Sequence, residues 1–112
     1  MKVDDLNNYN IAVEGVFKDK LQDLTECEFW ILYELNKESN QNVLELAARR
    51  RRSFQTVARV SYNLRDRGFV TVDVSTKDAR ARILNLTEKG RKLYRRAANA
   101  IHRTTKELKE AV

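Results

Sequence analysis

The sequence predicts a mainly α-helical fold of the α+β class, formed by a single domain of 112 residues. Three observations favour this class: apolar residues recur at helical spacing along most of the chain, the period changes to two in one short segment, and hydroxyl residues stand where helices should begin. The composition, 42% apolar and 34% charged, is typical of a globular protein. Because no apolar run reaches the roughly 18 residues that span a bilayer, and the N-terminus lacks the apolar segment of a secretory signal, we expect a cytoplasmic protein without membrane partners.

Two helices are predicted before residue 40. Apolar residues at helical spacing indicate a first helix that ends near Lys20 or Leu21. Thr25 and Glu28 form a capping box, in which the hydroxyl and the carboxylate satisfy free amides at the start of a second helix. That helix turns four residues inward before it ends in the polar stretch KESNQN: Phe29, Leu32, Tyr33 and Leu35.

A run of four arginines, Arg49–Arg52, follows a short third helix that begins at Val43. Successive side chains of a helix step by about 100° around its axis, so a continuous helix would point at least one of them into the core. Burying an unpaired guanidinium is costly. The run therefore predicts a helix end and a turn.

A fourth helix is predicted between Ser53, as its N-cap, and Gly68, which can end it in a left-handed conformation. Its inward stripe contains one aromatic, one hydroxyl and two aliphatic residues: Phe54, Val57, Ser61 and Leu64, with Val60 flanking. Its outward face is polar: Gln55, Thr56, Arg59 and Asn63.

After this helix the spacing of apolar residues changes from the helical period to every second residue. Valines at 70, 72 and 74 alternate with polar residues, and RILNL follows the polar turn STKDARA, which predicts a two-stranded hairpin. Thr87 can cap a last helix that reaches about Glu110 and is about 36 Å long at 1.5 Å per residue. This order of elements describes a winged helix-turn-helix, in which the fourth helix enters the major groove of DNA and the hairpin is the wing.

The last helix is longer than a three-helix core requires. We therefore expect a winged-helix core at residues 24–86, with residues 1–22 and 87–112 forming dimerisation helices. The predicted dimer interface is largely apolar: Leu6, Val13, Phe17, Leu93, Ala97, Ile101, Thr104 and Leu108. Two-fold pairing there would set the recognition helices about 34 Å apart and require a near-palindromic site.

The net charge of +6 is concentrated in the middle of the chain: residues 44–96 contain fifteen Lys or Arg against five Asp or Glu. A basic segment of this kind indicates a nucleic-acid surface. The predicted DNA-binding residues lie in the turn, the fourth helix and the wing: Arg49, Arg50, Arg51, Arg52, Ser53, Gln55, Thr56, Arg59, Asn63, Lys77, Arg80 and Arg82. The arginines of the turn suit phosphates, although a merely solvated turn is an alternative.

Specific roles can be assigned within this set. Gln55, Thr56 and Arg59 are candidates for base edges, and the wing arginines suit a narrow minor groove. Ser53 can instead be only a cap, and Asn63 only a phosphate contact. Arg80 can also pair with Asp78 to shape the turn of the wing.

Four stretches occur in a characteristic order: LTECEFWIL, LAARRRRSFQTVARV, LRDRGFV and DARARILNLTEKG. Together they resemble the MarR family of bacterial and archaeal transcription regulators and its shorter SarA-like relatives. The resemblance implies a homodimer built from both chain ends, and often implies relief of DNA binding by a small ligand or by cysteine oxidation. Where that family has apolar or glycine residues, this chain has Arg50, Arg51 and Arg52, so we expect Phe54 to fill the core there.

Other residues favour structural roles. Acidic neighbours should raise the pKa of Cys27, the single cysteine, so a buried or inert thiol is favoured over a redox sensor. His102, the single histidine, is expected on a helix surface. Phe29 and Trp30 are expected in the core or in dimer packing, and Tyr62 is as compatible with scaffold packing as with DNA contact.

The sequence thus favours a homodimeric, sequence-specific double-stranded DNA-binding transcription regulator, acting as a repressor and associated with the nucleoid. The alternative is a low-specificity DNA-organising or plasmid-partition-type winged-helix protein, and an RNA- or protein-binding winged helix is a third class. No cofactor or metal is expected. We find no phosphate loop, no nucleophile with a base and no paired catalytic carboxylates, so we do not expect an enzyme.

Overall fold

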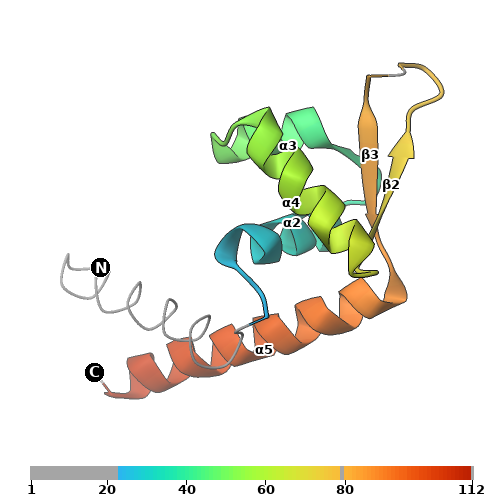
Figure 1. The fold of residues 1–112 in the computed structure, drawn as a ribbon. Coiled ribbons are helices and arrows are strands. Elements are labelled where there is room, and N and C mark those ends of the chain that lie inside the picture. The colour runs from blue at the N-terminus through green and yellow to red at the C-terminus, as the bar shows by residue number, and fades with distance from the viewer. Residues whose placement is uncertain (1–22, 79, 112) are drawn as a thin grey trace. The chain divides into compact units, whose positions relative to one another are not determined.

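The fold is taken from a computed structural model that describes residues 23–78 and 80–111, with side chains described as far as Lys106. Figure 1 shows its helices and strands in chain order: α2 (Glu26–Lys37), β1 (Gln41–Asn42), α3 (Val43–Arg50), α4 (Phe54–Asp66), β2 (Val70–Val74), β3 (Arg82–Leu86) and α5 (Glu88–Ala111). The predicted first helix, with Leu6, Val13 and Phe17, lies outside the described residues. The mainly α-helical winged-helix class is confirmed.

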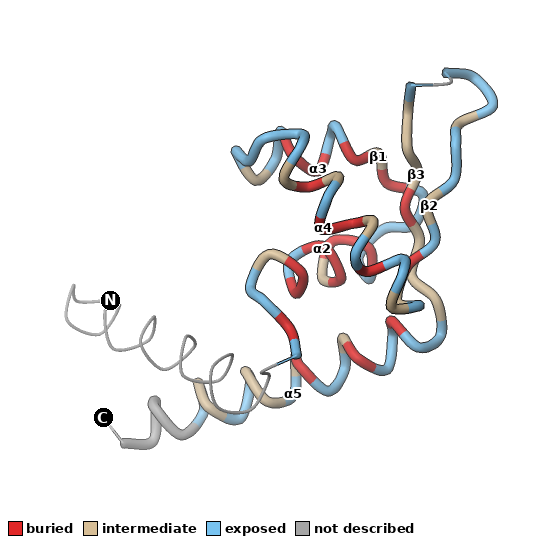
Figure 2. The backbone as a smooth tube through the Cα atoms, viewed as in Figure 1, coloured by how far each residue is buried: buried red, intermediate tan, exposed pale blue. Residues whose placement is uncertain are grey.

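The chain divides into two compact units. One is Cys27–Tyr94, and the described part of the other comprises residues 23–26 and 95–111. The first unit has its core where three helices and the central strand each contribute a leucine: Leu32, Leu46, Leu64 and Leu84, all at most 2% exposed. Figure 2 shows the buried positions along the inner faces of α2, α3 and α4.

The sheet has the strand order β1-β3-β2 and is antiparallel throughout. The predicted hairpin is confirmed, with Val70 opposite Leu86 and Val74 opposite Arg82. Burial decreases along β2, from Val70, which is buried, to Val74, which is 56% exposed, because the hairpin extends beyond the helices toward its tip (Figure 1). The sequence did not predict β1, since two residues are too few to show a period.

The helix ends predicted on either side of the hairpin are confirmed. Gly68 has a φ of 85°, in the left-handed region, after the end of α4. The hydroxyl of Thr87 donates to the Gly68 carbonyl at 2.7 Å and accepts from the amide of Gly90 at 3.0 Å, which caps α5. A side chain at Gly90 would overlap the Phe69 carbonyl, so only glycine allows the backbone to approach there.

The inward stripe of α4 is confirmed at Val57, Ser61 and Leu64, which are at most 3% exposed. The buried Ser61 hydroxyl donates to the Val57 carbonyl at 2.7 Å and so keeps a hydrogen bond. The prediction for Phe54 was wrong, because its side chain is 41% exposed. Phe54 is the first residue of α4, and helical spacing alone cannot show that the core ends before the first turn.

In the other unit, Leu24 and Ala97 are buried, and Ile101 and Thr104 are half-buried. Arg96 contacts Asp23 at 3.1 Å. The side chain of Leu108 lies outside the described part of the chain. None of the described helices is both long enough and apolar enough to cross a membrane.

Candidate nucleic-acid interface

The outward face of α4 is polar and accessible. Gln55, Arg59 and Asn63 lie, as predicted, on the side opposite the buried stripe, and all three are exposed. The Ser53 side chain accepts from the Thr56 amide at 3.1 Å, which confirms its role as N-cap, and its hydroxyl donates to the Thr56 hydroxyl at 2.7 Å. Thr56 is therefore half-buried and already hydrogen-bonded within the first turn of the helix.

The arginine run forms the end of α3 and the turn before α4, as predicted. Arg51 has a φ of 53° and a ψ of 39°, the left-handed conformation that commonly ends helices. Its amide donates to the Ala48 carbonyl at 3.3 Å, and the Arg52 amide donates to the Ala47 carbonyl at 3.0 Å. These two bonds close the helix end in the manner of a Schellman motif, at a position where glycine is usual.

The first two arginines of the run turn back toward α2. A terminal nitrogen of Arg50 lies 2.9 Å from a carboxylate oxygen of Glu34, and one of Arg49 lies 3.5 Å from the other oxygen. Arg49 also donates to the side-chain oxygen of Gln41. Because the Glu34 side chain is only 11% exposed, it is a nearly buried acid with two basic partners.

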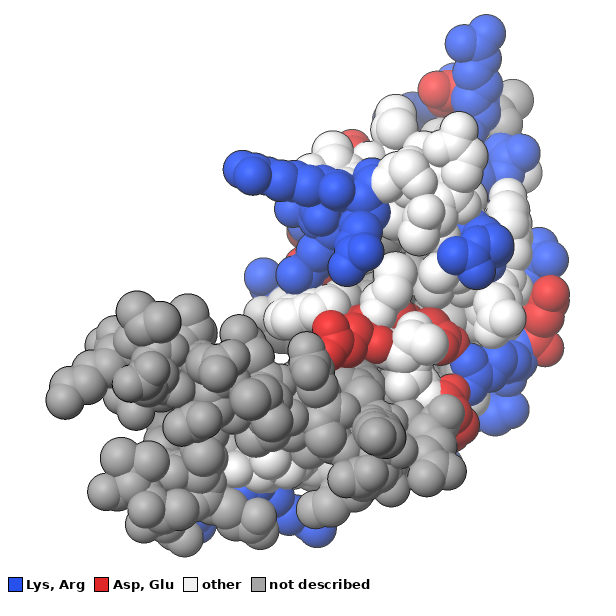
Figure 3. All heavy atoms as spheres, turned by 60° about the vertical axis from the view of Figure 1, so that its left-hand side comes forward, with Lys and Arg blue, Asp and Glu red and all other residues white. Residues whose placement is uncertain are grey.

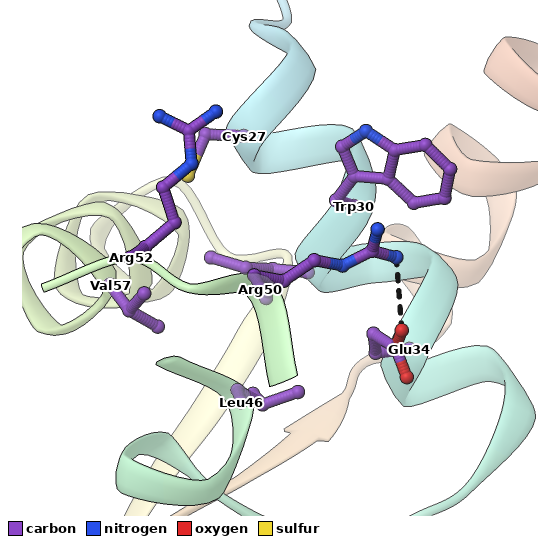
Figure 4. A pocket seen from close by; sticks show the side chains of 8 residues that line it. Cys27, Trp30, Glu34, Leu46, Arg50, Arg52 and Val57 are labelled. Carbon is purple, nitrogen blue, oxygen red and sulfur yellow. Dashed lines mark hydrogen bonds and ion pairs between the residues drawn. The ribbon is translucent and has the colours of Figure 1, made fainter. Parts of the chain in front are cut away.

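Arg50 has a second contact within the same unit. Its guanidinium lies 3.8 Å from the centre of the Trp30 ring, a short distance for a cation–π contact. Figure 4 shows this guanidinium between the indole of Trp30 and the carboxylate of Glu34. Phe29 is 7% exposed, which confirms a core position, whereas Trp30 is 39% exposed, so for Trp30 the alternative of dimer packing stays a prediction. One ring face is covered by Arg50 instead of the apolar core.

The last two arginines of the run are exposed. Neither Arg51 nor Arg52 has an ion pair within the part of the chain that the structure describes. Figure 3 shows basic side chains gathered over this end of the unit and at the tip of the hairpin. The four predicted phosphate contacts therefore differ: two have acidic partners inside the fold, and two are available to an outside anion.

The tip of the hairpin is also basic. Lys77 and Arg80 are exposed, and Arg82 is half-buried at the start of β3. The Ser75 hydroxyl oxygen accepts from the Lys77 amide at 3.2 Å, and the Asp78 carboxylate accepts from the Arg80 backbone amide at 2.9 Å. Asp78 thus shapes the turn through the Arg80 backbone, and Arg80 remains exposed.

Cys27 lines a cavity of about 170 Å³ in the same unit. Burial raises the pKa of the thiol, Arg52 and Arg59 lower it, and Glu28 raises it, with a net increase. The direction agrees with the sequence prediction, but the main cause is burial and not the acidic neighbours. The sequence did not show that arginines come close to this thiol in space, as Figure 4 shows for Arg52.

Two residues that hold this region together were missed. Glu34 and Gln41 receive the inward arginines, yet neither was among the predicted site residues. A signal for Glu34 was present, since it lies on the inward face of α2 beside Ile31 and Leu35, and a carboxylate there requires a cationic partner. His102 is exposed, as expected, and Tyr62 is half-buried, with the Arg65 guanidinium 4.7 Å from its ring centre.

No family model and no curated protein matches this chain. Its fold nevertheless resembles those of several solved structures. The PcaV transcriptional regulator from Streptomyces coelicolor superposes with a TM-score of 0.83 at 20% identity, over 96% of this chain and 79% of that one. For the transcriptional regulator BldR from Sulfolobus solfataricus the TM-score is 0.77 at 22% identity, over 95% of this chain and 74% of that one. For wild-type MarR from E. coli the TM-score is 0.80 at 16% identity, over 96% of this chain and 79% of that one.

PcaV has also been solved in complex with its natural ligand, and against that structure the TM-score is 0.72 at 24% identity, over 80% of this chain. The match spans 63% of the length of that PcaV chain. The resemblance to MarR-type regulators that the sequence motifs indicated is thus confirmed at the level of the fold. The chain has the winged-helix fold that these transcriptional regulators share.

Proposed function

We propose that this chain binds double-stranded DNA as a transcription regulator and is not an enzyme. The observation that carries the proposal is the polar face of α4, where Gln55, Arg59 and Asn63 lie opposite a buried apolar stripe. A recognition helix reads base edges in the major groove with such side chains, and its N-terminal residues come closest to the bases. The resemblance to solved transcriptional regulators supports the same conclusion.

Six of the predicted DNA-binding residues have specific roles in this proposal. Arg59 reads guanine and Gln55 reads adenine through paired hydrogen bonds. Arg51 and Arg52 contact phosphates, where guanidinium groups bind strongly. Arg80 and Lys77 of the hairpin tip reach the neighbouring minor groove, which attracts basic side chains where it is narrow. Binding at a promoter would then repress transcription by blocking access.

We further propose that the regulator is a homodimer whose chain ends form the interface. The half-buried Ile101 and Thr104 lie on the stripe of α5 that includes Ala97. A charge there, as in Ile101→Glu, should give monomers and abolish operator binding, because a two-fold site requires both recognition helices. Sedimentation of the wild-type protein and of this variant measures the effect. The exposed His102→Glu is the matched control, and a stable wild-type monomer at micromolar concentration would reject the dimer.

The central experiment is selection of bound sites from random DNA. Sequence-specific regulation predicts that one near-palindromic site is enriched, with half-sites about one helical turn apart. A low-specificity DNA organiser, the second candidate, would enrich no sequence and would bind all duplexes with similar affinity and strong salt dependence. The basic turn and wing tip are compatible with both, whereas Gln55 and Arg59 on the outward face of α4 favour the first.

A further inference from the structure

Phe54 is an exposed aromatic residue at the first position of α4. Its side chain is 41% exposed, whereas the other bulky apolar residues of this helix, Val57, Val60 and Leu64, are at most 8% exposed. An apolar side chain left in water forgoes the stabilisation that burial would give. The scaffold therefore gains little from an aromatic ring at this position.

The backbone beneath Phe54 is well defined. Ser53 caps the helix through the Thr56 amide and hydroxyl, and the Val57 amide donates to the Ser53 carbonyl at 3.2 Å. The first turn of α4 is thus hydrogen-bonded on both sides of Phe54. The residue is held in place at the end of the helix, between the exposed residues Ser53 and Gln55.

We propose that Phe54 reads thymine through the C5-methyl group of the base, an inference that rests on the proposed DNA-binding function. In the major groove this methyl is the apolar group by which thymine differs from cytosine, and apolar side chains, including phenylalanine, contact it. The N-terminal residues of a recognition helix are those nearest the base edges. Phe54 occupies that position, with a potential base-reading residue, Gln55, directly after it.

The expected contribution is small but measurable. Burying one methyl group is worth about 0.8 kcal/mol, which corresponds to about a fourfold change in affinity. Phe54→Ala should therefore weaken binding to the selected site at least fourfold and relax the preference for thymine at one position in each half-site. Arg59→Ala should instead relax the preference at a different base pair.

Replacement of thymine by deoxyuridine removes only the methyl group and leaves base pairing intact. We would measure the affinity of the full chain for the selected duplex, with each thymine replaced in turn, for the wild-type protein and for Phe54→Ala. At one symmetric position, the substitution should lower the affinity of the wild-type protein about fourfold. It should not lower the affinity of Phe54→Ala any further. Leu44→Ala is the matched control, because Leu44 is 60% exposed on α3 and its variant should keep the full sensitivity to the methyl group.

The outcomes separate the two proposals. If no sequence is enriched from random DNA, sequence-specific recognition itself fails. The other outcome is that a site is enriched while deoxyuridine lowers the affinity of Phe54→Ala as much as that of the wild-type protein. In that case DNA recognition stands and the role of Phe54 is rejected. Phe54→Leu, which keeps an apolar side chain, should retain part of the discrimination. Thermal unfolding of each variant shows whether a loss of affinity comes from a loss of fold.

Discussion

The two halves of the arginine run lie in different environments although their sequence is identical. Arg49 and Arg50 contact Glu34 of α2, and Arg50 also stacks on Trp30. Arg51 and Arg52 are exposed, and their backbone closes the end of α3. Because an acid inside the fold neutralises part of the run, we expect fewer phosphate contacts from it than its four charges would suggest. The first half is paired with Glu34, although the Arg49 side chain is itself 46% exposed, and we expect the second half to contribute most to DNA binding.

Loss of the inward half should affect stability most. Arg50→Ala removes the cation–π contact and leaves the nearly buried Glu34 with Arg49 alone, so we expect a loss of about 2 kcal/mol in the free energy of unfolding. Urea denaturation measures this loss. In the double variant Arg50→Ala/Glu34→Ala the stranded carboxylate is gone, and the total loss should be smaller than the sum of the single losses. Wild-type stability of Arg50→Ala would show that the contact contributes nothing.

Replacement of Arg51 should change the free energy of unfolding in the opposite direction. Its left-handed conformation is unfavourable for a residue with a Cβ atom and suits glycine. Arg51→Gly should therefore stabilise the fold by about 0.5–1 kcal/mol while it weakens DNA binding, because it removes the guanidinium that we propose binds phosphate. Arg51→Ala is the matched control, since it removes the same charge but keeps the backbone strain. Equal stability of the two variants would argue against strain at this turn.

The pKa of the Cys27 thiol tests the position of Arg52 in the absence of DNA. Burial raises the pKa of this thiol and Arg52 lowers it, so Arg52→Met should raise the pKa further and slow alkylation by iodoacetamide above pH 8. Met keeps most of the bulk of the arginine side chain, and Arg51→Met is the control. The same thiol also gives stability a pH dependence. Because folding raises its pKa, the protonated thiol favours the folded state, and this contribution to stability is present at neutral pH and is lost as the pH rises through that pKa. An unchanged alkylation rate would place Arg52 away from the thiol.

The sequence predicted most of the features that depend on neighbours along the chain. Ser53 as N-cap, Gly68 as a helix end and the buried stripe of Val57, Ser61 and Leu64 follow from local chemistry and helical period. The hairpin followed from its period of two in the same way. Phe54 was misplaced because the period indicates which side of a helix a residue occupies but not how far along the helix the core extends.

The features that sequence reasoning missed join residues far apart in the chain. Glu34 lies fifteen residues before Arg49 and sixteen before Arg50, and the proximity of Arg52 to Cys27 depends on the packing of α2 against the turn. Such pairings leave no periodic trace. An acid on the inward face of α2 does indicate that a cation must approach, although it does not identify which one.

The salt dependence of DNA binding tests the division of the run most directly. Each phosphate that a basic side chain neutralises releases condensed counterions, so removing one such side chain changes the slope of log K against log salt by about 0.9 on duplex DNA. On one selected duplex, Arg51→Gln should reduce the slope by about that amount, whereas Arg50→Gln should leave it at the wild-type value even where affinity falls. An equal reduction of the slope by both variants would contradict the account, because Arg50 would then bind DNA in the same way as Arg51.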